Sequence, residues 1–148
     1  AKALMDFVTE RASSGNYDLV IVDCPPGVSN TVVQAMRGAQ LALLTTEPTP
    51  LGLSTLKLAL KVVEKLGLRA YVVVNRADIS PPGLKAIKEL AAEEGLEILA
   101  EVPFDEAAVK ASVEGVPVVE LTPSSGAGKA LLGLAERVLS LSRHLPKA

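Results

Sequence analysis

The clearest structural signal in the chain is the segment Tyr17-Asp18-Leu19-Val20-Ile21-Val22-Asp23-Cys24-Pro25-Pro26-Gly27. Leu19 to Val22 form a short apolar run rich in β-branched residues, which is typical of a strand buried on both faces of a parallel sheet. This pattern places Asp23 at the carboxyl end of a strand, where open α/β sheets have their ligand crevice. A carboxylate there needs a partner, and a hydrated Mg²⁺ would supply one. Gly27 follows two prolines that lack N–H donors, and its own N–H can approach an anion closely.

Strand and helix patterns alternate along the rest of the chain. Apolar runs predict strands at Leu41 to Thr45, Ala70 to Val74, Leu96 to Val102 and Val116 to Leu121. Helical spacing and cap residues predict helices at Lys2 to Ser13, Val28 to Arg37, Leu53 to Leu66, Pro81 to Glu94, from Asp105 as cap to Glu114, and Ser125 to Arg143. Because strands that alternate with helices form βαβ units, we expect an α/β fold with a mostly parallel sheet and helices on both faces.

Composition limits the classes of function. The chain has 148 residues, of which 49% are hydrophobic and 3% aromatic, as expected for a single domain with an aliphatic core. The formal net charge of -2 gives no reason to expect nucleic acid as a partner. No apolar run approaches the roughly 20 residues that span a bilayer, so we expect no stable membrane insertion. The single cysteine, Cys24, excludes an internal disulfide and favours a cytoplasmic location.

Polar residues follow three of the predicted strands. Asn75 begins the sequence Asn-Arg-Ala-Asp, and its side chain offers both the donor and the acceptor that reading an adenine edge requires. Arg76 either stacks on a base or stays solvated, and Asp78 braces the loop. The competing interpretation of this group is ordinary turn chemistry after a strand. Glu47 either lines the crevice or accepts hydrogen bonds at the start of the next helix, and we favour the second. Asp105 is expected first of all to cap a helix.

Asp23-Cys24-Pro25-Pro26-Gly27 after a hydrophobic strand resembles the second switch of the MinD/ParA/Mrp group of P-loop ATPases, most closely the MinD-like ATPases with an inserted ferredoxin module. The resemblance implies that Asp23 holds Mg²⁺ through water and that the Gly27 amide senses the γ-phosphate of ATP. It also implies that Asn75 contacts adenine, with three further candidates for the base pocket, namely Arg76, Pro103 and Asp105. A helix-capping Asp23 in an unrelated α/β protein is the alternative.

The sequence departs from the family at the phosphate loop. Family members begin with a strand and a Lys-Gly-Gly-x-Gly-Lys-Thr/Ser loop, which is absent from these 148 residues. The segment Ser124 to Ala130 contains Gly-Lys, but Pro123 stands where the first glycine is needed and Ala130 lacks the hydroxyl group that binds Mg²⁺. We therefore interpret this segment as the start of the last helix. The resemblance implies a single domain, residues 1–148, that is the carboxyl-terminal half of a MinD-like domain, with no catalytic residues and no appreciable ATPase activity alone.

The expected partners follow from this interpretation. An apolar sheet that lacks the phosphate-loop strand has an exposed edge, so we expect a homodimer or other self-association, or a missing amino-terminal half or partner protein. The complete form would act on a partner, with iron–sulfur assembly as one candidate. The alternative function is a non-catalytic α/β module that binds a protein or a small anion. A receiver-like domain is disfavoured, because such domains cluster acidic residues at an early strand and this chain has one such aspartate.

Overall fold

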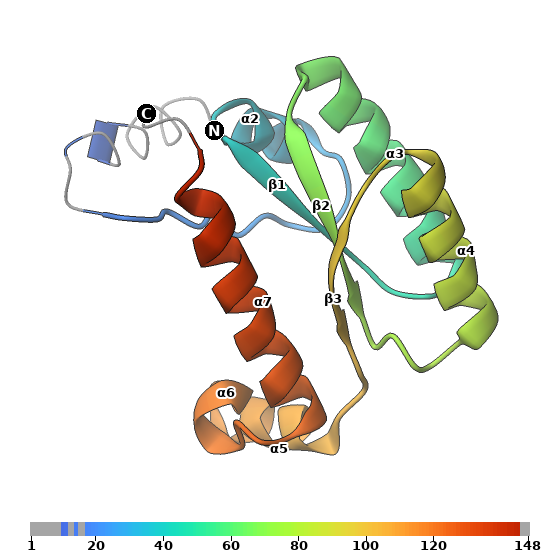
Figure 1. Ribbon diagram of the computed structural model, residues 1–148, viewed down its shortest axis with the longest axis vertical. Helices are drawn as coiled ribbons and strands as arrows, with labels where there is room; N and C mark the ends of the chain where they lie inside the picture. Colours follow the sequence, from blue (N-terminus) through green and yellow to red (C-terminus); the bar gives the residue numbers. More distant parts are fainter. Residues whose placement is uncertain (1–9, 12–13, 15–16, 146–148) are drawn as a thin grey trace.

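A three-stranded parallel sheet forms the centre of the computed structural model, which describes residues 10–11, 14 and 17–145. The strands are β1 (Leu41–Thr46), β2 (Arg69–Asn75) and β3 (Ile98–Val102), in the spatial order β1-β2-β3 (Figure 1). Both strand pairs are parallel, so the three carboxyl ends lie at the same edge of the sheet. The α/β class predicted from the sequence is confirmed.

Helices cover the two faces of the sheet unequally. Helices α3 (Pro50–Leu66) and α4 (Pro81–Glu93) lie on one face, and α7 (Gly126–Ser142) lies on the other (Figure 1). The shorter helices are α2 (Asn30–Arg37), α5 (Glu106–Glu114) and α6 (Val118–Leu121). Each of the two long helices on the first face starts with a proline in its first turn after a Thr or Ser cap, the arrangement expected at a helix start.

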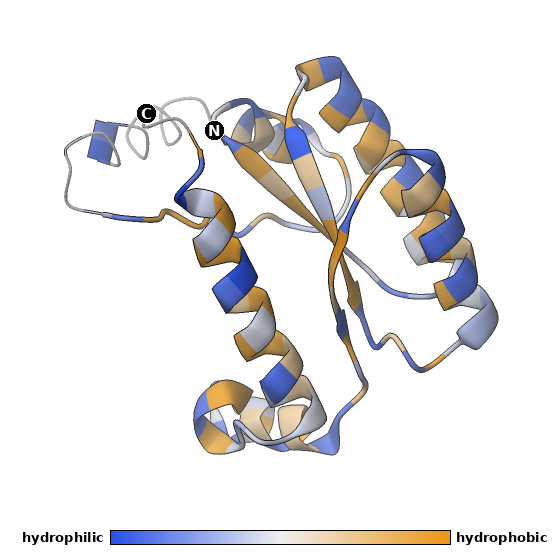
Figure 2. Ribbon diagram, in the orientation of Figure 1, coloured by the Kyte–Doolittle hydropathy of each residue, from blue (hydrophilic) through white to orange (hydrophobic). Residues whose placement is uncertain are grey.

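Two separate apolar clusters hold these layers together. Figure 2 shows the apolar residues along the strands and helices. The larger lies between the sheet and the helices α3 and α4, and it includes Ile87, which has no exposed surface. The smaller joins β2 and β3 to α7 through Val73, Val102 and Ala127. Helix α7 packs mainly against β3, and Leu43, on β1, is 38% exposed.

The predicted strand at Leu19 to Val22 is wrong. This segment has neither helix nor strand structure, and Ile21 is 79% exposed while Val20 and Val22 are each 40% exposed. A β-strand is stable only when its N–H and C=O groups pair with a neighbouring strand, whatever its β-propensity. Among the described residues, β1 pairs with β2 alone, so no strand lies beside this apolar segment.

The predicted strand at Val116 to Leu121 is also wrong, because Val118–Leu121 forms the short helix α6. Its amide groups bond within the segment, from Leu121 to the Pro117 carbonyl at 3.1 Å and from Thr122 to the Val118 carbonyl at 2.8 Å. Contacts with α5 and α7 stabilise this turn, so tertiary packing overrides the β-propensity of the valines. The predicted helix at Lys2 to Ser13 lies mostly outside the described residues, of which Glu10 and Arg11 are helical.

Candidate functional site

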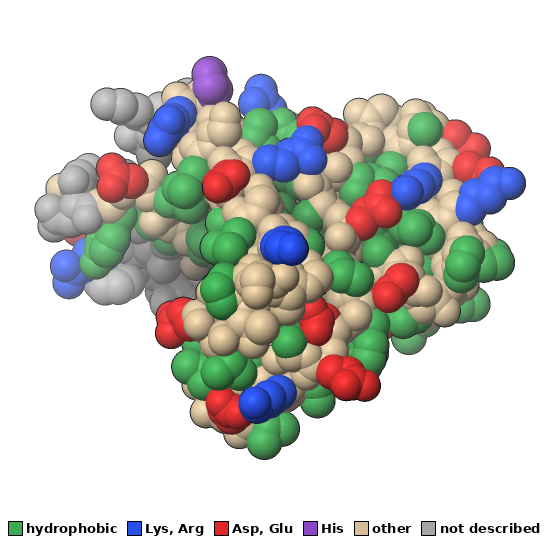
Figure 3. Space-filling model, turned by 60° about the horizontal axis from the view of Figure 1, so that its bottom comes forward, with side chains coloured by type: hydrophobic (Ala, Val, Ile, Leu, Met, Phe, Trp, Pro, Cys, Tyr) green, Lys and Arg blue, Asp and Glu red, His purple; other side chains and the backbone are tan. Residues whose placement is uncertain are grey.

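The loops after β1, β2 and β3 lie together at the carboxyl edge of the sheet, and the amino-terminal ends of α3, α4 and α5 follow these loops directly (Figure 1). Helix amino termini present unpaired N–H groups and a partial positive charge, which favours anions at this edge. Figure 3 views the molecule from this side and shows acidic, basic and apolar side chains interspersed. The edge therefore offers main-chain donors rather than a strongly basic surface.

The loop after β2 carries Asn75 and Arg76. Asn75 is the last residue of β2, is half-buried and pairs in register with Val102 of β3. Arg76 has a φ of 49°, in the left-handed region that costs a non-glycine residue about 1–3 kcal/mol. Its Nε lies 3.6 Å from Oε1 of Glu47, so an ion pair joins the loops after β1 and β2.

Glu47 therefore differs in role from the prediction. Its carboxylate pairs with Arg76, and the hydroxyl group of Thr49 caps α3 by accepting from the Gly52 amide at 3.0 Å. The sequence signal for this cap was present, since Thr followed by Pro is a common helix start.

Asp105, after β3, is a helix cap, as predicted. Its Oδ1 accepts from the Ala107 amide of α5 at 2.9 Å, and its Oδ2 accepts from the Ala127 amide of α7 at 2.8 Å. These bonds, the one from Ala127 above all, hold the pKa of Asp105 below its ordinary value of 3.8. Each carboxylate oxygen already accepts a main-chain hydrogen bond, so Asp105 organises this edge by joining two helix starts.

Pro103 stands between the β3 strand and this cap. A Cβ atom added at Gly126 would lie 3.1 Å from the Pro103 ring, so the start of α7 packs closely on the loop after β3. The structure thus brings together Asn75, Arg76, Pro103 and Asp105 through the register of β2 and β3 and the hydrogen bonds of their loops.

Asp23 and Gly27 are not joined to this group. Both are exposed, and Gly27 has a φ of 88°, which a residue with a side chain rarely adopts. Within residues 17–145, no hydrogen bond or ion pair links either of them to the loops after β2 and β3. In the same described part of the chain, no cluster of three metal-ligating side chains is formed.

The segment Ser124 to Ala130 is the start of α7, as predicted. The Ser125 hydroxyl group caps the helix by accepting from the Gly128 amide at 3.0 Å. A Cβ atom at Gly128 would lie 2.5 Å from the Thr122 carbonyl oxygen, so this glycine serves a close contact of the main chain.

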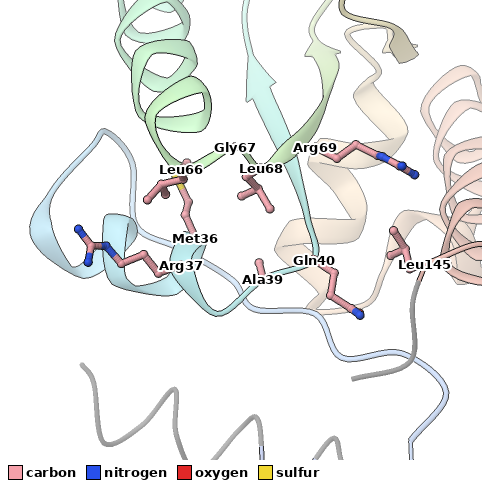
Figure 4. Close-up of a pocket in the computed structure, with 9 residues that line it drawn as sticks. All are labelled: Met36, Arg37, Ala39, Gln40, Leu66, Gly67, Leu68, Arg69 and Leu145. Carbon is pink, nitrogen blue, oxygen red and sulfur yellow. The ribbon is translucent and has the colours of Figure 1, made fainter.

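A hollow lies at the opposite edge of the sheet (Figure 4). Its volume is about 450 Å³, and it lies where α2 and α3 end and β1 and β2 begin. It is lined by Met36, Arg37, Ala39, Gln40, Leu66, Gly67, Leu68, Arg69 and Leu145. None of the residues predicted for the site lines this hollow.

None of the helices among the described residues has the length and apolarity needed to cross a membrane.

Comparisons with known proteins found matches that cover most of the chain. Residues 1–139 match the model of the ParA family, described as NUBPL iron-transfer P-loop NTPase. The iron-sulfur cluster carrier protein of Pyrococcus abyssi is 29% identical over 145 residues, which cover 88% of this chain and 48% of the relative. The human cytosolic Fe-S cluster assembly factor NUBP2 is 29% identical over 151 residues, which cover 92% of this chain and 55% of the relative.

Solved structures agree with this match. The septum site-determining protein MinD from Pyrococcus horikoshii, complexed with Mg-ADP, has a TM-score of 0.80 and 28% identity, and the superposition covers 96% of this chain and 58% of that chain. MinD from Aquifex aeolicus has a TM-score of 0.78 and 26% identity, covering 91% and 58%. The chain therefore spans about half the length of the relatives named above.

Proposed function

Because this chain belongs to the ParA family of P-loop NTPases, we propose that it is the base-binding and switch half of a MinD-like nucleotide-binding domain. The observation that carries the proposal is the juxtaposition of Asn75 and the loop after β3 at the carboxyl edge of a parallel sheet, next to several helix starts. That edge is where open α/β sheets bind their ligands. The ligands in this proposal are ATP and Mg²⁺.

Each candidate residue has a distinct role in the proposal. Asn75 reads the adenine edge through its amide group, and the main chain around Pro103 closes over the base. Arg76, held by Glu47, flanks the base, and Asp105 fixes the loop by accepting hydrogen bonds from the first turns of α5 and α7. The donors needed for a purine are thus supplied by one amide side chain and main-chain groups.

Asp23 and Gly27 complete the phosphate end of the proposed site. Mg²⁺ in nucleotide sites is usually held by one or two carboxylates together with water and the phosphates, so one exposed carboxylate fits a water-mediated role. Gly27 is exposed and has a positive φ, and in the proposal its amide binds the γ-phosphate. The chain contains no phosphate-loop lysine with its adjacent Ser or Thr, so we expect no appreciable ATPase activity from these 148 residues alone.

The missing phosphate-loop strand is proposed to lie against β1. Among the described residues, the outer strands β1 and β3 each have one strand partner, β2. The two outer strands differ in that the guanidinium group of Arg137, on α7, donates to the Leu99 carbonyl oxygen of β3 at 2.7 Å. The exposed Leu43 and Ile21 would be covered by such a strand. The strand would come from the other half of the domain, and without it the open edge favours self-association.

A role in iron–sulfur assembly is part of the proposal, since relatives carry the names cluster carrier and cluster assembly factor. The one cysteine, Cys24, cannot supply the four thiolates that a cluster usually takes, so further ligands would come from another chain or segment. The human relative is named cytosolic, which together with the single cysteine supports a cytoplasmic location.

A nuclear magnetic resonance titration tests the proposal. Amide signals of residues 75–78, 104 and 105 are expected to shift with Mg-ATP and not with Mg-tripolyphosphate, which lacks the base. Asn75→Ala should abolish these shifts, whereas Asn30→Ala, at the exposed start of α2, should leave them unchanged. Equal shifts with tripolyphosphate would instead indicate an anion-binding module. Shifts confined to the hollow at the other edge would contradict the proposed site.

A further inference from the structure

Two hydrogen bonds enclose Pro103 between the loops after β2 and β3. The Ala77 amide donates to the Val102 carbonyl at 2.9 Å, and the Phe104 amide donates to Oδ1 of Asp78 at 2.7 Å. Pro103 lies between these two bonds and has no N–H, so the ladder between the strands cannot continue through it. The Asp78 carboxylate supplies the next acceptor and extends the pairing of the two loops beyond the strand ends.

Asp78 is the middle connection in a row of three. Glu47 pairs with Arg76 and joins the loops after β1 and β2, Asp78 joins the loops after β2 and β3, and Asp105 joins the last of these to the start of α7. A hydrogen bond from an amide to a carboxylate is stronger than one between neutral groups. Four segments that are far apart in the sequence are therefore tied into one rim at the carboxyl edge.

We propose that Asp78 is a positioning residue for the base end of this rim. By holding the Phe104 amide, it sets the separation between Asn75 and the main chain at Pro103, between which a purine would lie. Hydrogen bonds weaken steeply beyond about 3.5 Å, so a small opening of the two loops removes contacts to the base. The inference rests on the proposed function, because the affinity that Asp78 controls is that for the base of a nucleotide.

Comparison of Asp78→Ala with Asp78→Asn distinguishes a residue that positions the loop after β3 from one that contacts the ligand directly. The asparagine variant keeps an oxygen that accepts from the Phe104 amide, whereas the alanine variant has none. In the intact chain, hydrogen exchange of the Phe104 amide should be about tenfold faster in Asp78→Ala than in the wild type and close to the wild-type rate in Asp78→Asn. An unchanged exchange rate in Asp78→Ala would overturn the inference, whatever the chain binds.

Affinities for Mg-ATP and Mg-tripolyphosphate give the second measurement. Asp78→Ala should weaken Mg-ATP binding about tenfold and leave tripolyphosphate binding unchanged, whereas Asp78→Asn should restore the ATP affinity. A general loss of stability would not change one ligand selectively. Glu93→Ala, which removes an exposed carboxylate at the far end of α4, is the matched control and should bind as the wild type does.

The outcomes distinguish this inference from the proposed function. Wild-type affinity for ATP in Asp78→Ala would overturn the positioning role alone. Equal losses in Asp78→Asn and Asp78→Ala would also overturn it, because they would indicate that the carboxylate charge itself contacts the ligand. Absence of Mg-ATP binding to the wild-type chain would overturn the proposed function and, with it, the control of base affinity by Asp78.

Discussion

For Gly128→Ala, local sequence and tertiary structure predict changes in folding stability of opposite sign. Glycine inside a helix is less favourable than alanine by about 0.8–1.0 kcal/mol, so propensity alone predicts stabilisation. In this fold, the new Cβ atom would lie 2.5 Å from the Thr122 carbonyl oxygen and 2.8 Å from that of Pro123. Both neighbours are main-chain atoms and cannot rotate away.

The size of the stability loss follows from the distance by which the start of α7 must move. Ordinary contacts of a Cβ atom begin at 3.4 Å, so the start of α7 must move by nearly 1 Å from Thr122. Such overpacking costs about 1–3 kcal/mol, and the shift also strains the bond between the Gly128 amide and the Ser125 cap. After the gain in propensity, we expect a net loss of about 1–2 kcal/mol, or a fall in Tm of about 2–8 °C for a domain of this size.

Gly133→Ala is the matched control, because it makes the same chemical change in the same helix. A Cβ atom at Gly133 would have no neighbour within 4 Å, so the gain in propensity should appear undiminished as a rise in Tm of about 2–4 °C. Thermal unfolding followed by circular dichroism measures both variants. A rise in Tm for Gly128→Ala similar to that for Gly133→Ala would refute the close approach of α7 to the preceding loop.

Three further predictions concern the core, the acid stability and the sheet edge. Ile87→Ala, at a fully buried residue of the larger cluster, should lower the unfolding free energy in urea by about 2–5 kcal/mol, whereas Val113→Ala, at a residue 84% exposed, should change it by less than about 0.5 kcal/mol. The hydrogen bonds that lower the pKa of Asp105 stabilise the fold at pH values above the ordinary carboxyl pKa. This stabilisation is lost as the pH falls through the lowered pKa. Urea midpoints of Asp105→Asn should therefore fall less steeply than those of the wild type below about pH 4. Arg137→Met removes the donor to the Leu99 carbonyl oxygen of the outer strand β3, so light scattering should detect more self-association than in Arg143→Met, and equal scattering would contradict this protective role.

The strands β1, β2 and β3 were predictable because each contains a short apolar run that is bounded by turn residues. The cap at Asp105 was predictable from the residues that follow it, although its second bond, to the start of α7, was not. The segment Leu19 to Val22 has the same apolar pattern as the true strands and yet forms none, because no strand of the described chain lies beside it.

In the candidate site, too, some features follow from the sequence and others depend on the packed fold. The positions of Asn75 and Pro103 at strand ends predicted a shared edge, because parallel strands end on the same side of a sheet. The partner of Asp78 could not be predicted, because its bond to the Phe104 amide spans 26 residues and depends on the register of β2 against β3. Likewise, the sequence does not reveal that the position of a Cβ atom is blocked by main-chain atoms at Gly128 and open at Gly133.

From its amino acids alone, the chain specifies alternating apolar strands and amphipathic helices, their caps, and the side of the sheet on which its polar residues gather. These properties follow from periodicity and from the bonds that each residue makes within a few positions. The packed fold decides which strand finds a neighbour, which carboxylates are taken by distant amides and which glycines touch another part of the main chain. The reason is physical: hydrogen-bond partners and close contacts between remote segments exist only after the layers have packed.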